Sequence, residues 1–208
     1  QGEKGAVPHA KLQEIAKLSR EAGVWVVPTM ALWETLRGTA DLATLRAYPE
    51  LKYMPPQQIQ QWTSAQENLL KNSEFKPDVA RTVIQNRMRL LKALHDGGVK
   101  ILLGSDAPQR FSVPGFSIHH EMKRMADAGM KPYDILRSGT YNVGLYLKDK
   151  DNFGTIEVGK RADLILLDAN PLDDIDNIAR RSGVMVRGRW LPEREIQSRL
   201  DQIAASHR

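Results

Sequence analysis

The chain reads Gly98-Val-Lys-Ile-Leu-Leu-Gly-Ser-Asp-Ala-Pro108 near its midpoint. Residues 99–103 are a short run of strand-forming side chains interrupted by Lys100, and a glycine and the carboxylate of Asp106 follow. A short apolar run bounded by turn signals is typical of a buried parallel strand. In a barrel of alternating strands and helices, the chemistry lies at the carboxyl ends of the strands. Asp106 is therefore a candidate metal ligand and proton acceptor; the alternative is that it only caps the next helix or turn.

A second strand is predicted earlier in the chain. Apolar side chains spaced as on one helix face predict a helix over residues 9–22, and Gly23 follows as its C-cap. Residues 24–27 read Val-Trp-Val-Val and predict a strand that Pro28 ends, just before Thr29. Helix, glycine, strand and polar residue together form one half of an α/β repeat. Thr29 would face the same edge as Asp106, where it could hydrogen-bond substrate or could equally cap the following helix.

The residues between the two predicted strands, 30–97, are mostly helical, with breaks at Pro49, Pro55, Pro56 and Pro77. The apolar spacing is strongly helical from 78 to 94. Because this region is longer than a minimal crossover between two barrel strands, we interpret it as one crossover helix enlarged by an insertion that forms a lid or an oligomer contact.

After the strand at 99–104, the pattern predicts a loop over 107–115, a helix from Phe116 or Ser117 to about 128, and a further helix from Pro132 through Leu145. The composition changes near residue 150, which is the best domain boundary. Beyond it we predict a tight turn between short strands at 154–159, a strand at 162–168, a hairpin over 183–191 turning at Arg187-Gly188, and a terminal helix over about 192–205.

The composition excludes several classes of protein and site. The 208 residues include no cysteine, which rules out disulfides and thiolate metal sites. The net charge of +5 comes from scattered basic residues, whereas a nucleic-acid groove normally shows a dense basic stripe, so we expect no nucleic-acid partner. No run approaches the roughly 20 apolar residues of a membrane span, so we expect no membrane partner. The first residue is Gln1 and not Met, which suggests a processed or truncated product. No secretory pattern follows it, but in a truncated product this absence leaves the compartment open between cytoplasmic, periplasmic and secreted.

Two segments together resemble the metal-dependent amidohydrolases. One is Gly154-Thr-Ile-Glu-Val-Gly-Lys-Arg-Ala-Asp-Leu-Ile-Leu-Leu-Asp168 with Asn170-Pro-Leu172, which is similar to the C-terminal signature of that family. The other is Gly104-Ser-Asp106, which is similar to the aspartate at the end of the family's eighth barrel strand. Three further segments favour a branch that resembles imidazolonepropionase and Xaa-Pro dipeptidase: Val26-Val-Pro-Thr29, Ser117-Ile-His-His-Glu121 and Ala128-Gly-Met-Lys-Pro132.

The resemblance implies an α/β fold, namely the C-terminal portion of a (β/α)8 TIM barrel with a small β-sandwich. Residues 1–150 would then be a partial barrel carrying strands seven and eight and the helical insertion at about 30–97. Residues 151–208 would supply β-sandwich strands and the terminal helix. Within the C-terminal signature, Asp163 resembles a structural aspartate, which we assign to a turn or strand-edge hydrogen bond.

The resemblance also implies a hydrolase that cleaves a C–N bond in an amide, a cyclic amide or a dipeptide. The site would contain one or two Zn²⁺ ions. Asp106 would ligate zinc and carry a proton from metal-activated water to the leaving nitrogen. The family's other ligands have no match in this sequence, which contains no His-x-His. We therefore expect the chain to be inactive alone. It should need a missing N-terminal half of the barrel, form an intertwined assembly such as a homo-oligomer, or adopt an altered packing.

Three more residues are candidates for binding the small-molecule or dipeptide substrate. His119 lies just after the loop that follows the second strand, with a packed or surface histidine as the alternative. Arg110 in that loop could meet a substrate carboxylate with two hydrogen bonds, or could be solvated. Thr29 follows the first strand.

A different class of function remains open beside the hydrolase: a non-catalytic assembly or oligomerisation fragment whose long helical insertion mediates contacts.

Overall fold

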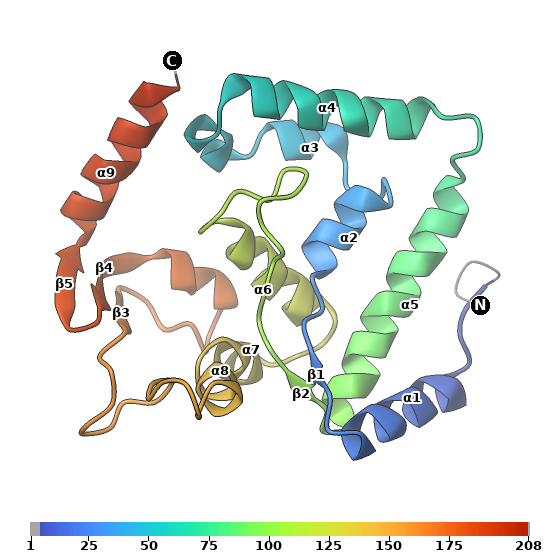
Figure 1. Cartoon of the computed structure of the whole chain (residues 1–208). Helices are drawn as coiled ribbons and strands as arrows, with labels where there is room; N and C mark the ends of the chain where they lie inside the picture. Colours follow the sequence, from blue (N-terminus) through green and yellow to red (C-terminus); the bar gives the residue numbers. More distant parts are fainter. Residues whose placement is uncertain (1–4, 208) are drawn as a thin grey trace.

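Two short parallel strands lie near the centre of the chain's fold (Figure 1). Helix α1 (His9–Glu21) leads through a tight turn into β1 (Trp25–Val26), and β2 (Lys100–Ile101) pairs with β1 in parallel, with Val26 opposite Ile101. This computed structural model describes residues 5–207. It confirms both predicted strands as a neighbouring parallel pair, although each is shorter than the apolar run that predicted it.

The chain between these strands is helical, as predicted. It forms α2 (Met30–Leu36), α3 (Leu42–Arg46), the 3-10 helix η1 (Pro49–Tyr53), α4 (Pro56–Lys71) and α5 (Pro77–Asp96). Three of the prolines that predicted breaks stand in the first turn of a helix, where the missing N–H costs nothing. Helix α5 returns the chain to β2 and packs along α1, whereas α3 and α4 lie together beyond the far end of α2 (Figure 1).

The segment after β2 contains α6 (Ser117–Asp127), α7 (Pro132–Gly139) and α8 (Tyr141–Tyr146). The prediction of one helix from Pro132 through Leu145 was wrong, because Thr140, at φ −126° and ψ −88°, interrupts it. Glycine and a β-branched residue are poor interior helix formers, and the pair Gly139-Thr140 places both at one point.

The C-terminal segment forms an antiparallel sheet in the order β3-β4-β5. Its elements are β3 (Leu164–Leu167), the 3-10 helix η2 (Ile175–Ala179), β4 (Arg181–Val186), β5 (Arg189–Pro192) and α9 (Glu193–Ser206). The predicted hairpin is confirmed, and Arg187 and Gly188 both have the positive φ that a two-residue hairpin turn requires. Residues 154–159 form turns but no strand flanks them, so that part of the prediction was wrong. Asp163 accepts a hydrogen bond from the Arg187 amide at 2.7 Å, which confirms its structural assignment.

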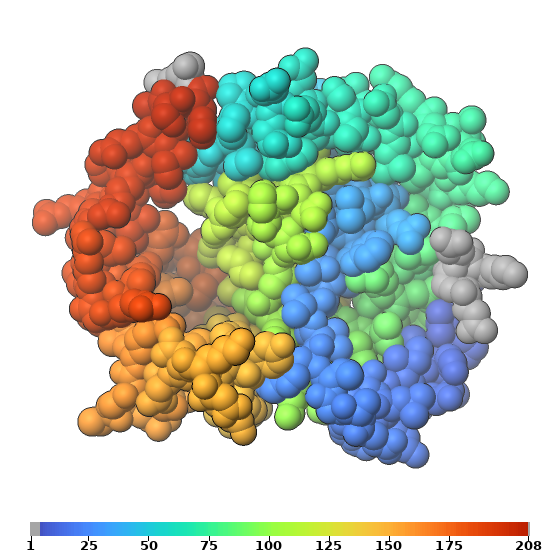
Figure 2. Space-filling model, viewed as in Figure 1, coloured from blue at the N-terminus to red at the C-terminus, as the bar shows by residue number. Residues whose placement is uncertain are grey.

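The main apolar core lies beneath the parallel strands, where α2, α5, α6 and α7 meet. Its buried members are Met30, Ile84, Leu91, Ile101, Met122, Met125, Met130, Ile135 and Ile175. A second cluster joins α3, η1 and α4 to Phe111 and Val113 of the loop after β2. The space-filling view shows the C-terminal segment, orange to red, along one side of this body (Figure 2). None of the helices formed by residues 5–207 combines the length and the apolar character needed to cross a membrane.

Candidate active site

Thr29 and Asp106 follow the carboxyl ends of β1 and β2, and these ends lie at the same edge of the parallel pair. The pairing extends past the strands, since the Leu102 amide donates to the Val26 carbonyl at 2.9 Å. Both residues have left-handed backbones, with φ of 48° at Thr29 and 55° at Asp106. Such conformations are uncommon for residues other than glycine and cluster at functional sites. Each strand is therefore followed by a residue with a left-handed backbone, a threonine after β1 and an aspartate after β2.

The Asp106 carboxylate is free of protein partners at this edge. The residue is exposed, and its side chain makes no hydrogen bond or ion pair with residues 5–207. The helix that follows, α6, has Phe116 at its N-cap and receives no side-chain cap. The alternative role as a helix cap was therefore wrong, and the carboxylate is available to an external group.

Two close contacts position the backbone that leads to Asp106. A Cβ atom at Gly104 would lie 2.7 Å from Cγ1 of Val27, so a larger residue at position 104 would force the Val27 side chain or the backbone to shift. One residue later, the hydroxyl oxygens of Ser105 and Ser117 lie 2.8 Å apart in a hydrogen bond that ties this turn to the start of α6. The turn before Asp106 is thus attached both to β1 and to α6.

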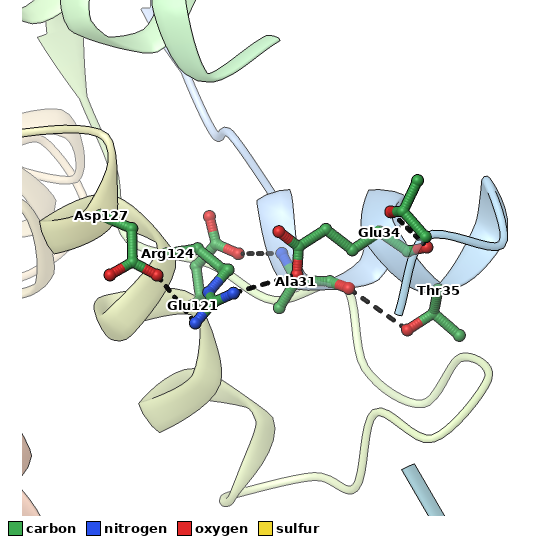
Figure 3. Close-up of polar contacts among 7 residues, drawn as sticks. Ala31, Glu34, Thr35, Glu121, Arg124 and Asp127 are labelled. Atoms are coloured by element: carbon green, nitrogen blue, oxygen red, sulfur yellow. Dashed lines mark hydrogen bonds and ion pairs between the residues drawn. The ribbon is translucent and has the colours of Figure 1, made fainter. Parts of the chain in front are cut away.

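Thr29 occupies the N-cap position of α2 without capping it. Its side chain makes no cap hydrogen bond. The Glu121 carboxylate of α6 accepts a hydrogen bond from the Ala31 amide at 2.9 Å instead (Figure 3), and the Met30 amide also stabilises it. The first turn of a helix has unsatisfied N–H groups and a positive end, which favour such a carboxylate. The Thr29 hydroxyl is thereby left available at the strand edge.

Glu121 is a fully buried acid that sequence reasoning missed. Burial raises its pKa above the usual glutamate range, although the Ala31 and Met30 amides oppose that shift. The sequence contained a signal for this burial: Glu121 lies on the same face of α6 as the apolar residues Met122 and Met125, where a charged side chain is unusual. A second polar contact between α2 and α6 joins Arg124 to Glu34 at 3.4 Å (Figure 3).

His119 is partly buried and lies within electrostatic range of Arg181 in the C-terminal segment. Its Nδ1 atom is buried and has no hydrogen-bond partner within the described chain. Burial lowers its pKa, and the positive charge of Arg181 on β4 acts in the same direction. Among residues 5–207, no hydrogen bond or ion pair joins His119 to Asp106. Because Nδ1 is buried, a ligand could use this nitrogen only if the side chain or its surroundings moved.

His120, its neighbour, has a structural partner that the sequence did not reveal. Its Nε2 lies 2.6 Å from Oε1 of Glu50, and its ring stacks on Tyr48 with the centroids 4.2 Å apart. Glu50 is buried, but hydrogen bonding to His120 lowers its pKa despite the opposing effect of burial. This contact fastens η1, within the predicted insertion, to the first turns of α6.

Arg110 lies in the loop after β2, beside the buried Phe111. Its side chain is partly exposed and makes no ion pair with residues 5–207. The structure therefore leaves its guanidinium unpaired in the part of the chain it describes, which is compatible with either of the two roles considered for it.

The described residues do not form a metal site by themselves. Across residues 5–207, no three His, Asp or Glu side chains come together as a ligand set. Zinc needs about four ligands in proteins, and Asp106 supplies one carboxylate. A metal at this edge would therefore require ligands from outside the described chain.

Comparison with known proteins identifies relatives of this arrangement. Residues 4–191 match the amidohydrolase family. No curated protein sequence matches the chain. Among solved structures, a bottromycin amidohydrolase is 24% identical with a TM-score of 0.72, over 89% of this chain and 40% of that one. A Xaa-Pro dipeptidase with bound methionine is 23% identical with a TM-score of 0.56, over 86% and 37%.

A prolidase in complex with N-methylphosphonate-L-proline is 24% identical with a TM-score of 0.55 and covers 86% of this chain. The chain spans about two fifths of the length of these structures, between 37% and 40%. At such identities the likeness concerns the fold.

Proposed function

Because the chain belongs to the amidohydrolase family, we propose that it is part of a hydrolase that cleaves a C–N bond and that Asp106 is its catalytic residue. The observation that carries the proposal is that the Asp106 carboxylate, which follows β2, is exposed and has no hydrogen-bond or ion-pair partner among residues 5–207. In barrels built of parallel strands, active sites lie at the carboxyl ends of the strands.

The proposed setting is a complete (β/α)8 barrel. In it, β1 and β2 would be strands seven and eight, and β3 to β5 would belong to a β-sandwich beside the barrel. The register of the β1–β2 pair supports this placement, since neighbouring barrel strands are parallel. The remaining strands would come from a part of the protein outside this sequence.

In the proposed reaction, the Asp106 carboxylate accepts a proton from the attacking water and delivers it to the leaving nitrogen. A bound Zn²⁺, one ion or two, would lower the pKa of that water. Residues 5–207 do not provide a set of three or more ligands for such an ion, so Asp106 is proposed only as one of its ligands.

The proposed substrate is an amide, a cyclic amide or a dipeptide. Two of the similar structures are named for dipeptide cleavage, as a Xaa-Pro dipeptidase and a prolidase, which supports the dipeptide class. Three groups would bind it: the Thr29 hydroxyl, the unpaired Arg110 guanidinium and the His119 ring. Arg110 is suited to a carboxylate, because a guanidinium donates two parallel hydrogen bonds.

A second candidate function is non-catalytic assembly, with this chain inactive alone. The observation that favours it lies in β3, where Ile165 and Leu166 are 53% and 56% exposed. Successive strand residues point to opposite faces, so neither face is fully covered by the described chain. The sheet is therefore suited to packing against further strands, whether from the same protein or from a second copy in a homo-oligomer.

The test of the hydrolase is Asp106→Asn in the complete enzyme, assayed on N-acyl amino acids, proline-containing dipeptides and cyclic amides. Loss of the proton acceptor should lower kcat by about 10²–10⁴-fold while the circular dichroism spectrum and Tm stay unchanged. Asp149→Asn, in an exposed turn, is the matched control and should keep full turnover. Full turnover of Asp106→Asn would refute the role of this carboxylate.

A further inference from the structure

The turn that carries Thr29 is held by charged side chains from two neighbouring helices. Arg87 of α5 donates from Nη2 to the Pro28 carbonyl at 3.2 Å. Glu121 of α6 accepts from the Ala31 amide at 2.9 Å (Figure 3). These two hydrogen bonds bracket Thr29, one on each side of it along the chain.

Thr29 needs external support to keep its conformation. A left-handed backbone is a genuine outlier for a β-branched residue and persists where the surrounding structure enforces it. The Thr29 side chain contributes nothing to this, because it makes no cap hydrogen bond. Besides the backbone hydrogen bond from the Trp33 amide to the Thr29 carbonyl at 3.1 Å, the turn receives one side-chain hydrogen bond from Arg87 and one from Glu121.

Burial of the charged groups of Arg87 and Glu121 lowers the stability of the folded protein. Glu121 is fully buried, and burial raises its pKa, whereas burial lowers that of Arg87. Within the described chain, Oε1 of Glu121 and Nε of Arg87 are buried without a hydrogen-bond partner. The guanidinium also lies 4.1 Å from the ring centroid of Trp33, which fixes its plane. Replacing buried charged groups by apolar side chains of similar volume is often neutral or stabilising, so a role beyond packing is a reasonable hypothesis for Arg87 and Glu121.

We propose that Arg87 and Glu121 are positioning residues that hold the turn 28–31 so that the Thr29 hydroxyl meets the substrate beside Asp106. This inference rests on the proposed hydrolase function and extends it to two residues that touch neither substrate nor the reacting atoms. A hydroxyl displaced by about 1 Å from its productive position is enough to lower an enzyme's rate up to about a hundredfold.

The experiment compares Glu121→Ala, Glu121→Gln and Arg87→Met in the complete enzyme. The matched control is Glu34→Ala, which breaks the other polar contact between α2 and α6 without touching residues 28–31. Two quantities are measured for each protein: amide hydrogen exchange of peptides covering residues 28–31, and the separate values of kcat and KM. Glutamine keeps an acceptor oxygen for the Ala31 amide and serves as the rescue variant.

We expect Glu121→Ala and Arg87→Met to speed exchange at 28–31 and to lower kcat/KM about tenfold or more, mainly through KM. Glu121→Gln should restore both quantities, and Glu34→Ala should change neither even if it lowers Tm. Unchanged exchange in Glu121→Ala would overturn the proposal regardless of activity. Faster exchange with unchanged kinetics would also overturn it, because the contact would then be purely structural.

Asp106→Asn separates this inference from the proposed function. If Asp106→Asn loses turnover while Glu121→Ala retains the wild-type kcat and KM, the hydrolase stands and the positioning role fails. If Asp106→Asn keeps full turnover, the proposed function fails, and the positioning role at that site is refuted with it.

Discussion

Glu50 and His120 show how one hydrogen bond connects distant parts of this chain. The Glu50 side chain is 6% exposed and His120 is 31% exposed, and their close contact joins η1 to α6. A buried carboxylate that loses its hydrogen-bond donor still bears the cost of desolvation. Removing the donor therefore destabilises the protein by more than the hydrogen bond's net contribution to stability.

His120→Gln should lower the free energy of unfolding by roughly 1–3 kcal/mol near neutral pH. Because the folded-state pKa of Glu50 is lowered, its stabilising contribution is present above the ordinary glutamate pKa and is lost as the pH falls through the lowered value. The difference between wild type and variant should therefore shrink in acid. Urea unfolding between neutral and acidic pH measures it.

The control for this prediction is Lys123→Gln. Lys123 forms an exposed ion pair with Asp176 at 3.3 Å, and such pairs contribute about 0–1 kcal/mol. A loss as large for Lys123→Gln as for His120→Gln would contradict the importance given to burial.

Helix α8 is placed by its contact with the turn that begins the C-terminal segment. The Gly144 backbone of α8 lies against the Phe153 carbonyl and Gly154, so closely that a Cβ atom at residue 144 would overlap that oxygen. A backbone carbonyl cannot move aside as a flexible side chain can. This contact joins the segment before residue 150 to the one after it.

Gly144→Ala should therefore destabilise the protein by about 1–3 kcal/mol, because either α8 or the turn must shift. Gly159→Ala is the comparison, since its Cβ would meet no atom and only the left-handed φ of 85° is strained. That cost should be about 1 kcal/mol. Thermal unfolding of both variants checks the prediction, and an equal loss in the two would show that the α8 contact is unimportant.

At the scale of the whole molecule, the described residues form one edge of a site rather than a complete site. They include the Asp106 carboxylate that we propose as catalytic, no set of metal ligands, and a sheet with exposed apolar residues on both faces. The similar structures extend well beyond the part that this chain matches. These observations agree with the proposal that further protein completes both the barrel and the metal site.

The metal content of the purified protein tests this view. The 208-residue chain alone should contain far less than one equivalent of zinc, because one carboxylate cannot hold the ion against water. The complete enzyme should contain one or two equivalents and should lose turnover when a chelator removes them. Intact mass with elemental analysis on the same sample measures both. Stoichiometric zinc in the isolated chain would contradict the prediction.

Local pattern determined much of this protein. The strand pair, the long helix α5, the hairpin at Arg187-Gly188 and the family resemblance all follow from residues close together in the chain, because periodicity and turn chemistry are local properties. That Thr29 and Asp106 face one edge stays a prediction, which the parallel pairing of β1 and β2 supports because parallel neighbouring strands end on the same side.

Only the tertiary structure decided which distant side chains contact one another around α2 and α6. Glu121 meets Ala31 across 90 positions of sequence, and His120 meets Glu50 across 70. Such partners depend on how helices pack, and no spacing within one helix specifies them. The left-handed backbone at Thr29, which a threonine does not favour alone, lies between the contacts that α5 and α6 make with Pro28 and Ala31, and these too depend on how the helices pack.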